Sequence, residues 1–477
     1  MGLAPLGSEG NLMGEEMAYR SRSKLHPSGR RIPSVEFVGL LLGLFLASGA
    51  GQRVAGWPAE GAVRNSGTSS DPAPVAASKP PVAIPQSVGW FEIPGTKLQS
   101  VCPPASPQYD FGDACQYVIA AWSGGIADEA RNRLILWGGG HNDYYGNEIY
   151  SLDLNTLKLT RLNNPSSPNS YRNEKCMEAL SDGRPNSRHT YGGLAYIKHA
   201  DRMFVFGGSL ACGPGNGAND TWTLDLATLT WRRMDPVTIA GGGRPPNDLL
   251  NSSSDYDPNT QLVFLHDRST LWSYSYDTNT YTRRADYGIG LGANSVIDPK
   301  RKLFFTIGSK DPGLGSGPGM FVVSIATGSN YAVQDWSAQV SGCDSFMSSE
   351  SIGLAYDSSQ DRIIGWANDG SGNVVHIFKP ETKSCATQTV AGGPTVAPGV
   401  RGVFGRFRYF PALNLFALVS DAEQNAFTLK LKSGGGTLPP PLPPPPPPPR
   451  CVKKFSLFGK SYSELQGESF SLTTNPY

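Results

Sequence analysis

The chain has 477 residues, of which 39% are hydrophobic and only 17% are charged, so it is long enough to bury a large core. Its 56 glycines and 39 prolines favour many tight turns over long surface helices, and we therefore expect an all-β protein. The formal net charge is +1 and no long basic run occurs, which argues against nucleic acid as a partner.

The first 50 residues carry the pattern of an export signal. Arg30 and Arg31 precede an apolar run from Val35 to Ala47, and small residues follow it. This run is shorter than the roughly 20 residues of an ordinary membrane span. We therefore predict a secreted or periplasmic protein with no stable membrane span in its mature form; an uncleaved membrane anchor is the alternative. Residues 51–87 are rich in Ala, Pro, Ser and Gly and are predicted to be a flexible linker.

The seven cysteines are compatible with an exported protein that contains disulfides. Pairing neighbours along the chain gives Cys102 with Cys115, Cys176 with Cys212, and Cys343 with Cys385. Cys451 is then left over, and reduced, buried cysteines are the alternative. No CxxC motif occurs, so neither a zinc ribbon nor a thioredoxin-like site is predicted.

A repeated unit organises residues 88–432. Its first half is a short strand, a turn and an apolar strand, and the turns at Asp257-Pro258 and Asp298-Pro299 are typical of type I turns. Six copies of this half begin at Gly124, Gly192, Ser253, Asn294, Gly353 and Phe407. Each copy is predicted to be a β-hairpin.

The second half of the unit is an alternating strand, a turn and a fourth strand. Copies begin at Glu148, Asp220, Thr270, Gly319 and Asn373. Four strands in a repeat of this length predict the blade of a β-propeller. The sixth copy lacks its fourth strand, and residues 89–98 supply an unmatched one, so we expect the N-terminal strand to close a six-bladed ring. Seven blades are the alternative if the segment between Leu162 and Arg188 contains a degenerate unit.

The first two blades resemble kelch repeats. They combine Gly-Gly after an apolar strand, an Asp-Leu strand and an outer tryptophan, as in Phe206-Gly207-Gly208, Leu224-Asp225-Leu226 and Trp231. The resemblance extends to galactose-oxidase-like propellers and implies the same fold. Copper chemistry of the galactose-oxidase kind implies a Tyr-His pair, and no Tyr-His dipeptide occurs in this sequence.

Polar loops are predicted to converge on one face of the propeller. The second strand of a blade ends where the first begins, so the loop after Gly138-Gly139-Gly140 meets the segments that precede the inner strands. The candidate residues of this funnel face are His141, Asn142, Asp143, Tyr144, Arg188, His189, Tyr191, His266, Arg268, Lys310 and Arg406. Polar residues near the glycines also serve to tie kelch blades together, which is the alternative for Asn142, Asp143 and Arg188.

These residue types are suited to β-elimination on a uronate-containing polysaccharide. A cation neutralises the carboxylate while histidine or tyrosine moves the proton. The set resembles that of secreted propeller lyases of the ulvan-lyase type, which implies His141 or His189 as base, Tyr191 as acid, and Arg188, Arg268, Lys310 or Arg406 as the carboxylate clamp. Asn142, Asp143, Tyr144 and His266 are candidate substrate-binding residues.

Two other functions are compatible with the sequence. One is a monomeric binding or scaffold propeller without catalytic activity, displayed on the Gly- and Pro-rich linker of residues 433–450 and followed by a short tail at 451–477. The other is a metal-dependent oxidase. No cofactor motif is found and no cofactor is predicted. The alternative is a copper or zinc ion bound by the three histidines of the funnel face.

Overall fold

The computed structural model describes residues 83–106, 114–141, 143–167, 176–212, 217–240, 251–310, 317–368, 372–397 and 400–433. The predicted export signal and C-terminal tail, most of both predicted linkers, Asn142 and Cys451 lie outside these ranges. No helix within them is long and apolar enough to span a membrane.

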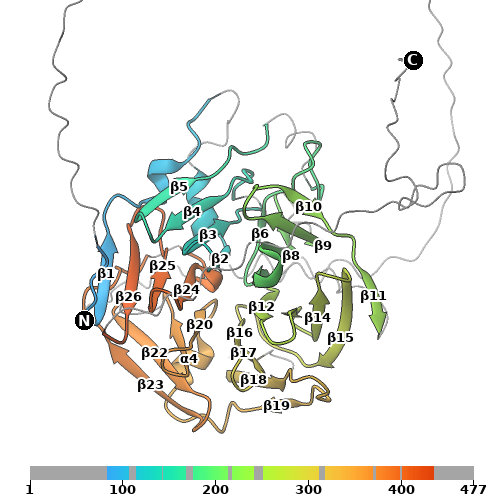
Figure 1. Cartoon of the computed structure of the whole chain (residues 1–477), viewed down its shortest axis with the longest axis vertical. Coiled ribbons are helices and arrows are strands. Elements are labelled where there is room, and N and C mark those ends of the chain that lie inside the picture. The colour runs from blue at the N-terminus through green and yellow to red at the C-terminus, as the bar shows by residue number, and fades with distance from the viewer. Residues whose placement is uncertain are drawn as a thin grey trace, which may run out of the picture. The chain divides into compact units, whose positions relative to one another are not determined.

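Six sheets of mainly antiparallel strands surround a common axis in the described part of the chain, as predicted (Figure 1). Blade 1 contains β2 (Gly124–Asp128), β3 (Arg133–Trp137), β4 (Tyr150–Asp153) and β5 (Lys158–Arg161). Blade 2 contains β6 (Arg188–His189), β7 (Leu194–Ile197), β8 (Arg202–Leu210), β9 (Gly217–Asp225) and β10 (Trp231–Arg233). Blade 3 contains β11 (Val237–Ala240), β12 (Ser253–Asp257), β13 (Leu262–His266), β14 (Thr270–Ser275) and β15 (Thr280–Asp286).

The second half of the ring repeats the same order from the axis outward. Blade 4 contains β16 (Asn294–Asp298), β17 (Leu303–Ser309), β18 (Pro318–Ser324) and β19 (Val333–Asp335). Blade 5 contains β20 (Gly353–Asp357), β21 (Arg362–Trp366), β22 (Val374–Lys379) and β23 (Ser384–Thr389). Blade 6 contains β24 (Phe407–Phe410), β25 (Leu415–Leu418), β26 (Ala426–Lys430) and β1 (Gly89–Ile93).

The ring closes through the N-terminal strand, as the sequence predicted. β1 pairs antiparallel with β26, in the register Gly89 with Lys430 to Ile93 with Ala426, and so supplies the outer strand of blade 6. Each inner strand also contacts the inner strands of both neighbouring blades, and β2 contacts β24 as well as β7. The described residues between Leu162 and Arg188 add no strand beyond an isolated bridge from Ala179 to Pro185, so the ring has six blades.

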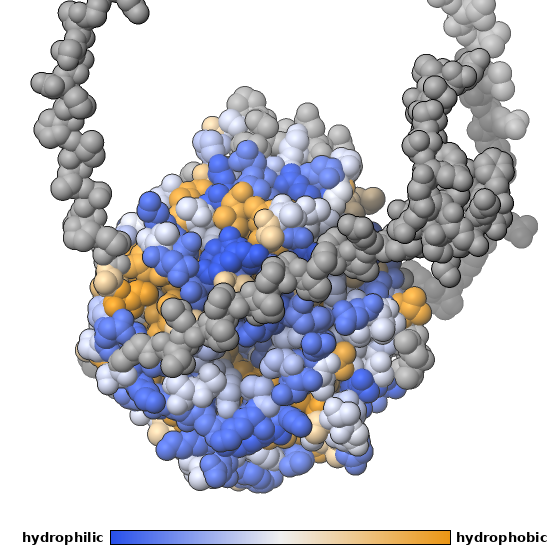
Figure 2. Space-filling model, in the orientation of Figure 1, coloured by the Kyte–Doolittle hydropathy of each residue, from blue (hydrophilic) through white to orange (hydrophobic). Residues whose placement is uncertain are grey.

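Apolar side chains fill the space between neighbouring blades. Each of the six interfaces has its own buried cluster; Leu134 and Phe410 pack between blades 1 and 6, for example, and Trp137 and Trp222 pack between blades 1 and 2. Adjacent blades therefore bury both faces of a sheet, and strands such as β7 and β21 are buried along their whole length. Figure 2 shows that hydrophilic residues dominate one outer face, with hydrophobic residues in small scattered groups.

Aspartates end four of the inner strands and shape the turns. The carboxylate of Asp257 accepts hydrogen bonds from the amides of Asn259 and Thr260, at 3.2 and 3.1 Å, and Asp298 accepts two from Lys300 and Arg301, both at 3.0 Å. Such Asx turns explain the Asp-Pro pattern of the sequence. β11 was not predicted: it runs parallel to β15 and adds a strand to the outer edge of blade 3.

Short helices fill a few connections. They are η1 (Leu98–Val101), η2 (Ala114–Gln116), α2 (Tyr117–Ala120), η3 (Lys198–Ala200), α4 (Asp344–Ser348) and η5 (Phe404–Arg406). Three disulfides join the cysteines that the sequence pairing predicted, with Cα–Cα distances of 5.9 Å for Cys102–Cys115, 4.9 Å for Cys176–Cys212 and 5.4 Å for Cys343–Cys385.

Candidate functional site

The inner strands define two ends of the propeller axis. We call the end at which they begin the entry face, and the end at which they turn into the second strand the turn face. β3 ends at the entry face because it runs antiparallel to β2, with Gly124 paired to Trp137. The loop that follows Trp137 and the segment that contains His189 therefore lie at the entry face, which is the predicted funnel face.

A left-handed residue precedes the inner strand in every blade. The residues at this equivalent position are Trp122, Tyr191, Asn251, Gly292, Ser351 and Phe404, with φ values of 41°, 47°, 72°, 77°, 58° and 47°. Glycine and asparagine tolerate this conformation, whereas bulky side chains in it are uncommon and strained. The three aromatic residues belong to the consecutive blades 6, 1 and 2, so aromatic rings gather at one side of the entry face. Strain of this kind is concentrated at functional sites.

These rings form one cluster with His189. The His189 ring lies 5.1 Å from Trp122 and 5.9 Å from Tyr191, between ring centroids, and Tyr191 lies 5.9 Å from Phe404. Tyr191 and Phe404 are buried beneath the surface, while Trp122 is half-buried. The guanidinium of the exposed Arg401 lies 5.2 Å from the Trp122 ring centroid. The cluster therefore presents an indole and a cation to solvent.

A histidine–carboxylate pair lies beside the indole. Nε2 of His189 is 2.7 Å from Oδ2 of Asp143, and the ring of His141 is 5.6 Å from that of His189. The His189 side chain is 5% exposed and that of Asp143 is 27% exposed, so the pair is reached from the surface through Asp143. A carboxylate bonded to one imidazole nitrogen orients the ring and stabilises its protonated form, as in a general base.

The glycines after β3 allow this loop to lie against blade 2. Gly140 has φ 82°, and a Cβ added there would be 2.3 Å from Cα of Arg188. His141 follows with φ 46° and donates its amide to the carbonyl of Leu210 at 3.0 Å. The close approach brings His141 and Asp143 of blade 1 to His189 of blade 2.

Two candidate arginines lie in the interior instead. Arg188 is completely buried; it pairs with Asp220 at 2.5 Å and donates to the carbonyls of Asn186, Gly207 and Glu178. Arg406 is also completely buried and donates to carbonyls of blades 1 and 6, including those of Ser123 at 2.9 Å and Ile119 at 3.0 Å. Burial lowers the pKa of Arg406 to about 9. Both side chains are fully engaged with the protein, so neither is part of the site that we propose below.

The candidates His266 of blade 3 and Lys310 of blade 4 are also engaged elsewhere. His266 is buried and its Nε2 lies 3.1 Å from the carbonyl of Tyr287, while Nδ1 accepts the amide of Arg268 at 3.1 Å. Burial lowers the pKa of His266 to about 3, so the ring is neutral. The amine of Lys310 pairs with Asp335 at 2.9 Å and lies 5.9 Å from the Phe321 ring centroid. The structure therefore gives His266 and Lys310 protein partners within their own blades.

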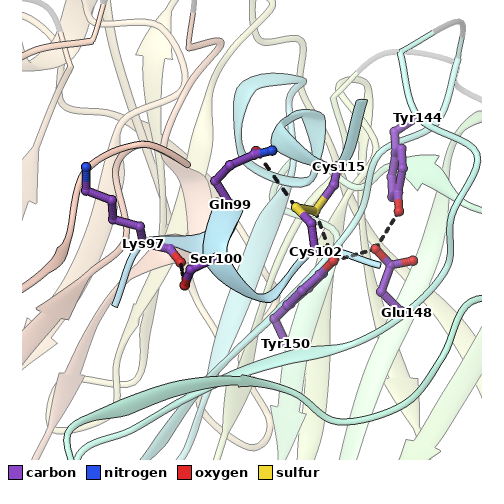
Figure 3. The surroundings of a disulfide bond; sticks show 8 residues. All are labelled: Lys97, Gln99, Ser100, Cys102, Cys115, Tyr144, Glu148 and Tyr150. Atoms are coloured by element: carbon purple, nitrogen blue, oxygen red, sulfur yellow. Dashed lines mark hydrogen bonds between the residues drawn. A yellow bond between two sulfur atoms is a disulfide. The ribbon is translucent and has the colours of Figure 1, made fainter. Parts of the chain in front are cut away.

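Tyr144 is buried, and its side chain points toward Glu148 (Figure 3). Its hydroxyl donates to Oε1 of Glu148 at 2.7 Å, and the hydroxyl of Tyr150 donates to the same oxygen at 2.6 Å. The Tyr150 hydroxyl also lies 3.1 Å from Sγ of Cys115, in the Cys102–Cys115 disulfide. Glu148 is completely buried, and this desolvation raises its pKa. We therefore leave Tyr144 out of the proposed site.

Trp122, Phe404 and Arg401 were missed in the sequence. The signal for Trp122 and Phe404 was their alignment with Tyr191 at one repeat position. Arg401 carried no local pattern; it reaches Trp122 because its carbonyl accepts the Trp122 amide at 3.2 Å. In the described part of the chain, no group of three or more His, Cys, Asp and Glu side chains is arranged to hold a metal ion.

Comparison with known proteins finds distant structural similarity and no family. No family model and no curated protein matches the chain. Among solved structures, the chain is similar to YjhT, with 14% identity over 68% of this chain and 95% of that chain and a TM-score of 0.41. It is similar to TolB from Acinetobacter baumannii, with 13% identity over 57% of this chain and 54% of that chain and a TM-score of 0.35. It is also similar to a chain of the nidogen/laminin complex, with 9% identity over 56% and 79% of the two chains and a TM-score of 0.36.

Proposed function

We propose that the entry face binds carbohydrate at Trp122, and that the adjacent His189–Asp143 pair makes it a polysaccharide lyase for uronate-containing glycans. The observation that carries the proposal is the half-buried indole lying 5.1 Å from a histidine that a carboxylate orients at 2.7 Å. An indole offers an apolar face on which a sugar ring stacks. The exposed guanidinium of Arg401 beside it supplies a partner for a carboxylate.

These residues divide the reaction between them. Arg401 pairs with the uronate carboxylate and stabilises the negative charge that develops on it. His189, held by Asp143, takes the proton from the carbon next to the carboxylate. The electron pair of that bond forms a carbon–carbon double bond as the glycosidic carbon–oxygen bond breaks, and His141 gives a proton to the departing oxygen, because Tyr191 is buried. Arg401 thus takes the clamp role that the sequence assigned to Arg188, Arg268, Lys310 or Arg406.

The test is turnover of purified protein on a panel of uronate polysaccharides, followed by the ultraviolet absorbance of the unsaturated product. We expect product with the wild type, and a loss of at least about 100-fold with His189→Ala, because a positioned general base contributes roughly 10²- to 10⁴-fold. The control is His199→Ala. His199 lies at the turn face, where it contacts Tyr256 and Asp277, and its loss should leave turnover unchanged.

The alternatives give different results in the same experiment. Glycan binding that requires Trp122 but yields no product with any polymer would favour a non-catalytic binding or scaffold propeller. Copper bound in a one-to-one ratio to the purified protein would favour the oxidase alternative. The lyase proposal fails in either case, and the carbohydrate-binding proposal fails if Trp122→Ala binds every glycan as the wild type does.

The three disulfides support an extracellular or periplasmic location, because such bonds persist in oxidising compartments. A polysaccharide substrate is encountered in those compartments. The Gly-Gly and Asp-Leu pattern of blades 1 and 2 supports a kelch-type origin for the propeller.

A further inference from the structure

A cavity opens at the turn face, at the opposite end of the axis from Trp122. Its volume is about 200 Å³, and all six inner strands line it together with residues of the turns that follow them. Among its lining residues are Tyr196, Tyr256, Tyr356 and Tyr409, which occupy equivalent positions in blades 2, 3, 5 and 6. The cavity is thus an axial pocket with aromatic walls.

Two opposite charges face each other across this pocket. The residues one position earlier in the six inner strands are Ile126, Ala195, Asp255, Val296, Ala355 and Arg408. Asp255 and Arg408 are the charged members of this level, and they belong to blades 3 and 6, which are opposite in a ring of six. Nη1 of Arg408 reaches to 4.0 Å from Oδ1 of Asp255.

Asp255 has hydrogen-bond donors within the protein, whereas Nε of Arg408 has no acceptor among the described residues. Oδ1 of Asp255 accepts the amide of Tyr256 at 3.0 Å, and Oδ2 accepts the amide of Ile297 at 2.9 Å. Arg408 is only 12% exposed, and its Nε is buried without a hydrogen-bond partner among the described residues. Burial lowers the pKa of Arg408 and raises that of Asp255. A buried N–H group without an acceptor is costly, and Nε of Arg408 is such a group.

The two completely buried arginines, Arg188 and Arg406, show how this protein satisfies a guanidinium. Arg188 has Asp220 and three carbonyls, and Arg406 has four carbonyls. Arg408 differs because it lines a cavity and its Nε has no acceptor among the described residues.

We propose that the turn-face pocket binds a small organic acid that carries a hydroxyl or ammonium group next to its carboxylate. The planar carboxylate fits the fork of Arg408, which is the geometry of bidentate recognition. The neighbouring donor fits Asp255, whose two oxygens keep acceptor capacity beyond the two amide bonds. The volume limits the ligand to a few non-hydrogen atoms beyond these groups. At the rim, Lys198 and Glu129 pair with each other at 2.9 Å and do not compete for the acid.

The test is calorimetric titration of the purified protein with glycolate, lactate, glycine and alanine. Three matched probes separate the parts of the proposal: propionate lacks the second donor, glycolamide lacks the carboxylate, and inorganic phosphate is an anion of another shape. We expect saturable binding of at least one hydroxy or amino acid, weaker binding of propionate, and none of glycolamide.

Two variants assign the binding to the pocket. Arg408→Lys keeps the charge and removes the fork, and we expect it to weaken binding by about tenfold or more. Asp255→Asn should abolish the preference over propionate while propionate itself binds as before. Arg283→Lys is the matched control, since Arg283 pairs with Asp286 on an outer strand and its change should leave the titration unaltered. Thermal unfolding of each variant verifies that it is folded.

Three results would overturn the proposal: no acid of the panel binds, Arg408→Lys binds as tightly as the wild type, or phosphate binds as well as the best acid. The lyase proposal is judged separately, because Arg408→Lys should leave turnover at the entry face unchanged.

Discussion

His189 and Asp143 come from neighbouring blades, and their side chains meet at 2.7 Å at the entry face. Asp143 lies in the loop after β3 of blade 1, and His189 lies on β6 of blade 2. The pair therefore exists only because Gly140 lets the loop pack against Arg188.

Asp143→Asn tests this pair. The amide keeps the shape of the side chain but loses the charge that stabilises a protonated His189, so we expect turnover on the lyase substrate to fall by about 10²-fold or more. The measurement is kcat/KM from initial rates. Asp277→Asn is the matched control, because Asp277 contacts His199 at 3.2 Å at the turn face. Equal losses in both variants would contradict a special role for Asp143.

Trp122 offers a test that separates binding from backbone strain. With φ at 41°, Trp122→Gly should be more stable to urea than Trp122→Ala by about 1 kcal/mol, because only glycine adopts this conformation without cost. Both variants should lose affinity for oligosaccharides, since both lack the ring. A glycine variant that binds sugar normally would show that the indole serves the fold alone.

The lowered pKa of His266 makes the stability of the protein depend on pH. This pKa is lowered from 6.5 to about 3, so the unfolded chain takes up a proton below pH 6.5 that the folded protein does not. Its contribution to the free energy of unfolding is therefore present above pH 6.5 and is lost as the pH falls toward 3. We expect His266→Asn to be less stable than the wild type by about 1–3 kcal/mol at neutral pH, because the hydrogen bond to Tyr287 is lost. This difference in the free energy of unfolding should shrink on acidification. An equal difference between the variant and the wild type in urea unfolding at neutral and at acidic pH would refute the prediction.

Substitution of Thr96 tests how much a single side chain contributes to ring closure. Thr96 is completely buried; its hydroxyl donates to the carbonyl of Ile93 at 2.5 Å and accepts the amide of Ala426 at 2.8 Å. Thr96→Val keeps the volume and leaves both groups without a partner, so we expect a loss of about 1–3 kcal/mol in the free energy of unfolding. Ser100→Ala is the control: Ser100 is exposed and donates to Lys97 at 2.7 Å (Figure 3), and its loss should be small.

For Glu148 we predict a pH dependence of stability opposite to that of His266. Burial raises the pKa of Glu148 above 4.5, so the folded protein holds a proton that the unfolded chain has lost. The free energy of unfolding from this group therefore falls as the pH rises above 4.5. Glu148→Gln still accepts hydrogen bonds from Tyr144 and Tyr150, and we expect it to be more stable than the wild type at neutral pH but not in acid. The measurement is chemical denaturation of the variant and the wild type at neutral and at acidic pH.

The sequence by itself determined the architecture. Alternating strands, Asp-containing turns and a repeated unit predict blades, and the strand at residues 89–98 predicts closure, because each of these depends on the order of residues within a short segment. The cysteine pairing followed from the same proximity along the chain. The parallel strand β11 escaped prediction because its partner β15 lies beyond the next three strands of blade 3.

Only the tertiary structure decided which polar side chains face a mouth of the ring. Arg188, His266 and Arg406 have the same residue types as Arg401 and His189, but carbonyls and a carboxylate of the surrounding blades engage them in the interior. The contact between Asp255 and Arg408 depends on two strands that stand opposite each other across an axis. The physical reason is that periodicity reports burial along one strand, whereas a site on a ring is assembled from the ends of many strands at once.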